Sequence, residues 1–505
     1  MPTLKRRKTL ERLRYENSTQ RLKRTLGPLQ LTVLGVGSTI GAGIYVMTGT
    51  AAANYAGPSI LLSFIVAGVA CLFTALSYAE LASVMPVSGS AYTYAYVSMG
   101  EGWAWAVGWL LLLEYGVSCA GVAAGFSGYA VSLAQDLGLH VPKALSSTTL
   151  QIATQDGGRS VMAGWRFDLP AAAAILAVSL LLVVGVRESF RINAGVVFLK
   201  VGVLVLFVAF GIRHVHPAYW VPFIPPHAGG FHYGVPGIFR AASIIFFAYV
   251  GFEAVSTASA EARHPRRDVP VGIVAALLVC TLVYMVVAAV LIGVVPWRLL
   301  DVADPLAIAV NAMGEPWLAI CIKLGAVIGL CSVLLGLLYA QSRIFYAMAE
   351  DGLLPGLFSR LHGHFQTPWI GSLLLGLLAA TATAVLPIDI ISDLVSLGTA
   401  SAFGIVCLTV IWMRNTAPDV PRLFRVPLGG FKVRGVWVGY VPLLGMAFCL
   451  VMVAPLCVDM ILALLAGDPL PLLLLLGYAV CGWAAYRFYG RRHSRMGQDG
   501  VPGMR

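Results

Sequence analysis

Long runs of apolar residues recur along nearly the whole chain, and this repetition restricts the folds open to it. Each run is close to the ~20 residues that an α-helix, rising 1.5 Å per residue, needs to cross a hydrocarbon layer about 30 Å thick. Because 59% of the 505 residues are hydrophobic and only 11% are charged, a water-soluble core could not bury them. The sequence therefore predicts an all-α, polytopic integral membrane protein.

Twelve of these runs have the length and composition of membrane-spanning helices, and we predict twelve transmembrane helices. They cover residues 30–54, 58–84, 102–135, 168–186, 190–212, 236–261, 269–295, 315–348, 368–387, 389–413, 436–460 and 469–488. The first run is too long for a secretory signal peptide and lacks a small-residue cleavage site, so we expect no cleaved leader.

The net charge of +11 is unevenly placed between these runs. With a cytoplasmic N-terminus, most Lys and Arg fall on the inner side, and the outer side holds only Lys143, Arg159, Arg166, Arg213 and Arg298, with Arg240 at the outer start of helix 6. This asymmetry predicts a plasma-membrane protein with both termini in the cytoplasm, and no nucleic-acid partner. A basic N-terminal tail that binds anionic lipid or a partner is the alternative.

The sequence shows no pattern typical of a metal site or an enzyme. All nine cysteines lie in the apolar runs or at their ends, without metal-ligand spacing. No phosphate-binding loop or nucleophile motif follows a strand. We therefore predict no cofactor, no metal and no catalytic residue.

The stretch GVGSTIGAGIYVMTG, residues 35–49, places five glycines within the first predicted helix. Each glycine costs a helix about 0.5–1 kcal/mol relative to alanine. In hydrocarbon, non-helical backbone is tolerated only where it is buried in protein or lines a wet cavity. The cluster therefore indicates either a break in the helix or close packing against a neighbouring helix.

A second interruption is predicted in helix 6, which reads IIFFAYVGFEAVSTASAEA from Ile244, with Gly251 in its middle and Glu253 two residues later. The two interruptions lie about five spans apart, as in an inverted repeat of five plus five helices. The N–H groups of a broken helix can bind a carboxylate, and freed carbonyls can accept from an ammonium group. The pair of breaks therefore suits a zwitterion.

Four ordered segments resemble a known family. GVGSTIGAGIYVMTG, SYAELASVMPVSGSAYTYAYVSMGE, FFAYVGFEAVSTASAEARHPRRDVPVGI and YAQSRIFYAMAEDGLLP are similar to the amino acid–polyamine–organocation (APC) superfamily of transporters. Within it the chain most resembles bacterial homologues of the cationic amino acid transporters. The resemblance is detailed over about residues 28–415 and general in the last two helices.

The resemblance implies a leucine-transporter-type fold that works by alternating access. The expected organisation is a basic cytoplasmic N-tail (1–27), a first inverted repeat with helices 1–5 (28–212), a second with helices 6–10 (213–415), helices 11 and 12 (416–488) and a cytoplasmic C-tail (489–505).

The resemblance also implies where an amino acid binds. Its carboxylate is expected at the first break, at Thr39, Ile40, Gly41, Ala42 and Gly43. Its α-amino group is expected at the second break, which includes Gly251, on carbonyls of Phe247, Ala248 and Tyr249, with Phe247 as an aromatic gate. Some relatives carry Thr where this chain has Ala42, and Ser38 or Thr39 is expected to replace that hydroxyl contact.

Three ionisable residues lie deep in predicted helices. Lys200 is about ten residues into helix 5, and in proton-coupled relatives a lysine here occupies the place of a sodium ion, so we expect it to couple transport to protons. A permanently charged lysine that locks helix 5 to helix 1 is the alternative. Glu114 is predicted to pair with Lys200, line the substrate path or bind a cationic side chain, unless it is a polar anchor. Glu253 is expected to receive the proton or to steady the inner half-helix.

The sequence therefore predicts a secondary active transporter for proton-coupled uptake of neutral amino acids, with a broad preference for small ones that extends to some cationic ones. Its expected partners are the amino acid, protons and the bilayer, and a monomer is compatible with these features. An exchanger or facilitator, in which Lys200 stays protonated, is one alternative. A transporter-like amino acid receptor is another, although the short tails leave no room for a soluble output domain.

Overall fold

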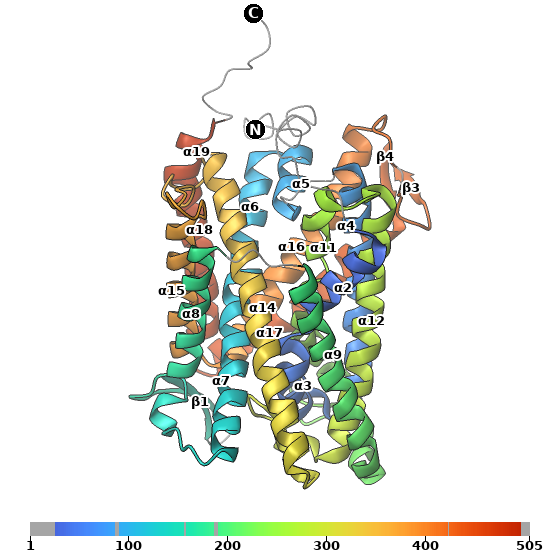
Figure 1. The fold of residues 1–505 in the computed structure, drawn as a ribbon. Coiled ribbons are helices and arrows are strands. Elements are labelled where there is room, and N and C mark those ends of the chain that lie inside the picture. Colours follow the sequence, from blue (N-terminus) through green and yellow to red (C-terminus); the bar gives the residue numbers. More distant parts are fainter. Residues whose placement is uncertain (1–25, 86–89, 156–157, 186–189, 423, 496–505) are drawn as a thin grey trace, which may run out of the picture.

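The structure is a computed structural model that describes residues 26–85, 90–155, 158–185, 190–422 and 424–495. It is a bundle of long helices with two short β-hairpins (Figure 1). Most of the basic N-terminal tail and the end of the C-terminal tail lie outside the described residues.

The helices follow one another with few interruptions by other structure. Their bounds are α2 Pro28–Thr39, α3 Thr48–Ala51, α4 Ile60–Val84, α5 Ser90–Ser98, α6 Glu101–Leu111, α7 Ser118–Asp136, α8 Leu169–Val184, α9 Phe190–Gly211, α10 Gly234–Ile245, α11 Ala254–Thr257, α12 Pro265–Val294, α13 Pro305–Ala312, α14 Pro316–Glu350, α15 Trp369–Val385, α16 Ile388–Thr416, α17 Tyr440–Leu465, α18 Leu470–Ala484 and α19 Arg491–His493.

Within the described residues, nine continuous helical segments are long and apolar enough to cross a membrane. Two further apolar helices, α8 and α15, are shorter. The helical, polytopic membrane fold is thus confirmed, while the count of twelve spans and the inverted repeat remain predictions.

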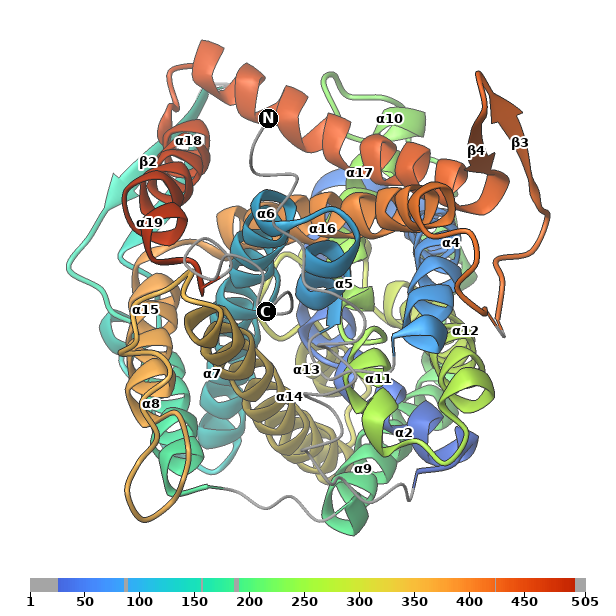
Figure 2. The same cartoon turned by 90° about the horizontal axis from the view of Figure 1, so that it is seen from above.

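Two groups of helices pack side by side. In one group α12 lies along α4 and α2, and α10 lies against α4. In the other group α14 packs on α7 and α15 on α8. Helix α16 contacts members of both groups, while α17 and α18 lie at the outer edge (Figure 2). The buried core therefore lies where the two groups meet.

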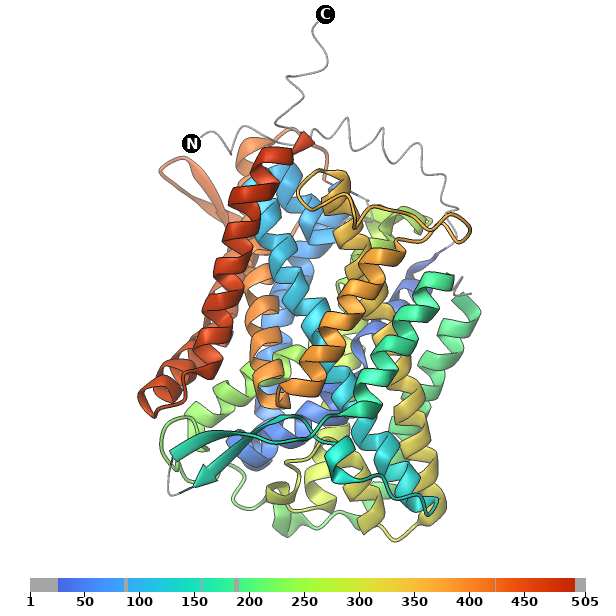
Figure 3. The same ribbon diagram turned by 90° about the vertical axis from the view of Figure 1, so that its left-hand side faces the viewer.

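Two antiparallel hairpins stand at opposite ends of the bundle (Figure 3). The first, β1 Leu150–Gln155 with β2 Gly158–Ala163, lies between the predicted spans 102–135 and 168–186. The second, β3 Gly430–Val433 with β4 Val436–Gly439, connects α16 to α17. Neither hairpin was predicted, because a few strand residues produce no signal beside long apolar runs.

Candidate functional site

The first predicted break is present in the structure. Helix α2 ends at Thr39, and Ile40 is extended, with φ −72° and ψ 100°. The chain resumes helical structure at the π-helical turn Gly43–Met47 and continues into α3. By helix geometry, the first N–H groups of the resumed helix have no partner in a preceding turn. The break therefore presents donors toward its surroundings in the middle of the bundle.

The second predicted break is also present. Helix α10 passes into a 3₁₀ turn, Phe246–Tyr249, and the chain is non-helical from Val250 until α11 begins at Ala254. Gly251 has φ +120°, a conformation that a residue with a side chain rarely adopts. Glycine is thus required at the point where this helix opens.

The two breaks touch each other. A Cβ atom on Gly43 would lie 2.2 Å from Cα of Ala248, and one on Gly251 would lie 2.6 Å from the carbonyl oxygen of Ser38. The Tyr284 hydroxyl of α12 lies 2.7 Å from the carbonyl oxygen of Thr39 and 3.0 Å from that of Ala248. Glycine is needed at both breaks for close approach, and Tyr284 joins them through their free carbonyls.

Lys200 of α9 is fully buried and reaches the first break. Its Nζ atom donates to the carbonyl oxygen of Gly37 at 2.9 Å and lies 3.4 Å from that of Ile40. Both carbonyls belong to the turn at which α2 ends. In a continuous helix they would accept from backbone N–H groups of the next turn, and here the ammonium group takes that place. The charge state of Lys200 and the geometry of the break are therefore linked.

Two buried carboxyl groups lie next to the second break. Glu253 accepts from the backbone N–H of Gly251 at 2.9 Å and from the Tyr115 hydroxyl at 2.9 Å. Glu114, in the π-helical turn Leu112–Val117, interacts electrostatically with Glu253. Neither of its oxygens has a hydrogen-bond partner within the part of the chain that the structure describes. Two buried carboxyl groups this close would repel each other if both were ionised.

The predicted carbonyl acceptors on the second break are partly engaged within the protein. The Phe247 carbonyl accepts from the N–H of Val250 at 3.1 Å, and that of Ala248 accepts from Tyr284. A carbonyl oxygen has two lone pairs, so each retains one acceptor position for a ligand. The Phe247 ring is buried and faces Gly121 of α7, consistent with a position beside the substrate path.

The hydroxyls considered as replacements at the first break bond to their own helix. Ser38 donates to the Leu34 carbonyl and Thr39 to the Gly35 carbonyl, each at 2.7 Å. In this conformation neither replaces the hydroxyl missing at Ala42.

Several groups near the site were missed by sequence reasoning. Tyr115, Tyr284 and Tyr78 are buried tyrosines whose contacts come from distant segments, so no local pattern predicted them. Among the described residues, the hydroxyl of Tyr78, both polar atoms of the Gln341 amide and the hydroxyls of Ser396 and Thr399 are buried without a hydrogen-bond partner. Such groups are typical of places where water or a ligand supplies the missing bonds.

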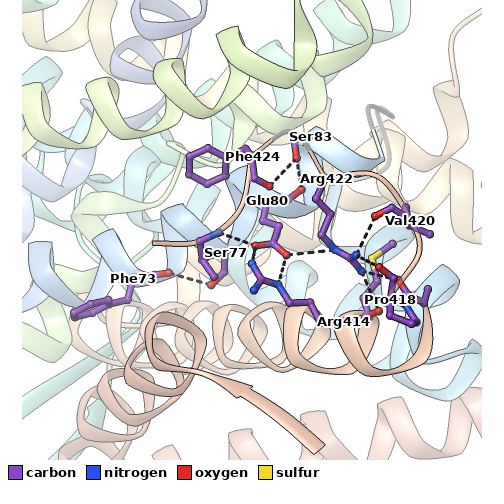
Figure 4. Close-up of polar contacts among 12 residues, drawn as sticks. Phe73, Ser77, Glu80, Ser83, Arg414, Pro418, Val420, Arg422 and Phe424 are labelled. Atoms are coloured by element: carbon purple, nitrogen blue, oxygen red, sulfur yellow. Dashed lines mark hydrogen bonds and ion pairs between the residues drawn. The ribbon is translucent and has the colours of Figure 1, made fainter. Parts of the chain in front are cut away.

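Two further buried charges have partners far away in the sequence. Glu80, at the end of α4, pairs with Arg414 at 2.5 Å and lies 3.7 Å from Arg422 (Figure 4). Lys323 is fully buried and pairs with Asp136 at 2.5 Å. Both partners lie far away in sequence, where no spacing rule could find them.

A mainly helical membrane fold in which two interrupted helices meet at mid-bundle is typical of a membrane transporter. The chain matches the amino acid permease family over residues 26–480. It belongs to this family, within the APC superfamily, as its four motifs predicted.

Named relatives are similar over most of the chain. The methylthioribose transporter of Bacillus subtilis is 42% identical over 450 residues, which cover 89% of this chain and 92% of that protein. The branched-chain amino acid permease BcaP of the same species is 39% identical over 98% of this chain and 99% of its own length. The vacuolar cationic amino acid transporter 4 of Arabidopsis thaliana is 37% identical over 83% of this chain and 68% of its length. All three are transporters and none is an enzyme.

Proposed function

We propose that this protein is a proton-coupled symporter that takes up amino acids across the plasma membrane by alternating access. Both termini would face the cytoplasm, and residues 28–212 and 213–415 would form the two inverted repeats. The observation that carries the proposal is the ammonium group of Lys200 on the carbonyls of Gly37 and Ile40. Loss of its proton would free these carbonyls and loosen the first break.

The carbonyl geometry supports coupling without sodium. Lys200 already places a cation at the end of α2, and a second cation there would be repelled at a few ångström in a medium of low dielectric constant. A neutral lysine in this buried place is accessible because desolvation disfavours the charged form. Proton binding and sodium binding are therefore alternatives at this point, and the lysine favours the proton.

The substrate that the breaks suit is a zwitterion. The N–H groups from Gly41 to Gly43 would bind the carboxylate, and the remaining lone pairs of the Phe247 and Ala248 carbonyls would bind the ammonium group. Phe247 would cover the ligand. Glu114 would accept a cationic side chain.

Relatives at similar identity differ in what their names say they carry: methylthioribose, branched-chain amino acids and cationic amino acids. This variety supports a broad preference rather than a narrow one. We propose neutral amino acids, with some cationic ones, as the substrates.

The test is uptake of labelled alanine into proteoliposomes in sodium-free buffer, with and without an inward proton gradient, in competition with arginine, leucine and glutamate. Accumulation that requires the gradient would support symport, and competition would rank the side chains. Methylthioribose is included as a competitor, and a preference for it over all amino acids would replace the proposed substrate class.

An exchanger is the second candidate, since a permanently charged Lys200 would make the same bonds to Gly37 and Ile40. Uptake that appears only after amino acid is loaded inside the vesicles would favour exchange and assign Lys200 a structural role.

A further inference from the structure

The β3–β4 hairpin has one apolar face and one covered face. In its register Phe431 pairs with Val438 and Val433 with Val436, while Lys432 pairs with Trp437. Because directly paired residues of antiparallel strands point to the same side, the first two pairs form a continuous apolar face. Phe431 is 37% exposed, and Val433 and Val436 are each 49% exposed. This apolar face is therefore open to the surroundings of the protein.

The hairpin also carries exposed cations. Lys432 lies on the other face, opposite Trp437, and Arg434 lies in the turn; both are exposed, and the segment 420–440 contains no acidic residue. Arg434 and Gly435 form the turn with φ +49° and +84°, the geometry of a two-residue hairpin. A surface that combines cations with exposed apolar side chains is complementary to a membrane with anionic headgroups above an apolar interior.

The hairpin connects two helices that are long and apolar enough to cross a membrane. It lies between the end of α16 at Thr416 and the start of α17 at Tyr440, two apolar helices of membrane-spanning length. It stands at the end of the bundle that carries α5 and α19 (Figure 1). The hairpin therefore lies beside the ends of two helices that could cross a membrane.

We propose that the β3–β4 hairpin is a lipid-binding element that places its apolar face in the membrane interface and binds anionic phospholipid headgroups through Lys432 and Arg434. Residues of this kind at a membrane surface gain affinity from apolar burial and from the negative surface potential together.

The opposite face of the hairpin carries Trp437, which contacts Arg414 and Asn415 of α16. The guanidinium group of Arg414 stacks over the Trp437 ring at 4.1 Å and also pairs with Glu80 of α4. The Asn415 side chain bonds to the backbone of Trp437 through its carbonyl oxygen at 2.7 Å and its amide at 2.9 Å. Figure 4 shows Glu80 held between Arg414 and Arg422. A lipid-bound hairpin would therefore hold Arg414 on Glu80 and stabilise the end of α4.

The test is thermal unfolding of the purified full-length protein in detergent, titrated with phosphatidylglycerol or with phosphatidylcholine. Phosphatidylglycerol is expected to raise the unfolding midpoint further than phosphatidylcholine. In the variant K432Q/R434Q the phosphatidylglycerol concentration that gives half of the increase is expected to rise about fivefold or more, because each cation near an anionic surface contributes to binding. The response to phosphatidylcholine should stay the same.

The matched control is R491Q/R492Q, which removes two exposed cations from α19 at the same end of the bundle. It should keep the wild-type response. The second variant, V433S/V436S, changes only exposed side chains and should weaken the response to both lipids while the lipid-free midpoint stays near that of the wild type. The proposal would be overturned if K432Q/R434Q kept the wild-type response to phosphatidylglycerol, or if R491Q/R492Q lost that response equally. It would also be overturned if neither lipid changed the unfolding midpoint while a soluble protein partner protected the hairpin.

Discussion

Lys200 shows how backbone carbonyls help to accommodate a buried charge. An ammonium group in the interior is costly unless its donors are satisfied. Here carbonyls freed by the end of α2 satisfy them, Gly37 at 2.9 Å and Ile40 at 3.4 Å. The break provides acceptors for the lysine, and the lysine stabilises the break. We therefore expect a change in the charge of Lys200 to change the conformation of the break.

We expect Lys200→Ala to lose uphill accumulation while it keeps the fold and downhill exchange. A gradient of about one pH unit can sustain about tenfold accumulation at one proton per substrate, because 1.4 kcal/mol corresponds to a factor of ten. The variant should therefore reach only the external concentration, measured as the ratio of internal to external alanine. Wild-type accumulation in Lys200→Ala would contradict the coupling role.

Gly43 is predicted to be irreplaceable by a large side chain. A Cβ atom there would overlap the Ala248 backbone, so Gly43→Leu should lower uptake about tenfold or more through overpacking of the two breaks. The measurement is initial uptake at equal protein density in the vesicles. The matched control is Gly195→Leu in α9, where no atom lies within 4 Å of the added Cβ. Equal uptake by both variants would mean that the approach at Gly43 is not needed.

The candidate site residues fall into two groups, according to whether the signal that predicts them lies nearby or far away in the sequence. Lys200, Glu253 and the glycine breaks were predicted, because a charge or a helix-weakening residue within an apolar run is visible locally. Tyr284 was not, since its hydroxyl serves carbonyls 245 and 36 residues away in the chain. Tyrosine is also common in ordinary cores, so its type carries no signal.

Arg240 joins three helices at once. This fully buried residue of α10 pairs with Asp393 of α16 at 2.8 Å and with Asp459 of α17 at 2.9 Å, and it lies over the Tyr55 ring at 4.8 Å. The sequence placed it only at the outer start of helix 6, because its two acidic partners lie more than 150 residues further along.

Arg240→Met should destabilise the protein strongly, by about 3 kcal/mol or more, because it leaves the carboxylates of Asp393 and Asp459 without their cation. The midpoint of unfolding in detergent measures this loss. Arg298→Met removes an exposed arginine that lies over the Trp297 ring, and its effect should be small. Similar midpoints for the two variants would show that the α10, α16 and α17 network contributes little to stability.

Asp304 makes the loop before α13 sensitive to pH. Burial raises the pKa of this carboxyl from its ordinary value of 3.8 to about 6, and the Ser132 hydroxyl and Lys323 only partly offset the effect. Because the folded state binds this proton more tightly than the unfolded state, stability should rise as the pH falls through about 6 and be lost as the pH rises.

We therefore expect the unfolding midpoint of the wild type to increase by a few degrees between pH 7.5 and pH 5 relative to Asp304→Asn, which cannot titrate. The two midpoints, measured side by side across this range, provide the comparison. A constant difference between wild type and variant would rule out titration of Asp304 as its source.

The helices could be predicted because long apolar runs define them, whereas smaller elements could not. Helix α5, Ser90–Ser98, lies outside all twelve predicted spans, because its alternating Tyr92, Tyr94 and Tyr96 leave it without a long apolar run. The β3–β4 hairpin escaped prediction because its four-residue strands are shorter than any reliable periodic pattern.

Taken together, the elements place both helix breaks where the two helix groups meet. Helix α12 supplies Tyr284 to both breaks, α9 supplies Lys200 to the first, and the π-helical turn before α7 supplies Glu114 and Tyr115 to the second. Movement of one group against the other would therefore act directly on the substrate contacts and on the groups that we propose to carry the proton.

Direct observation of proton movement provides the sharpest test of proposed symport. Proteoliposomes containing a pH-sensitive dye would be given alanine outside at equal pH on both sides, in sodium-free buffer. We predict that the lumen acidifies as alanine enters and that Lys200→Ala shows no acidification. Alanine entry without acidification in the wild-type protein would contradict proton coupling.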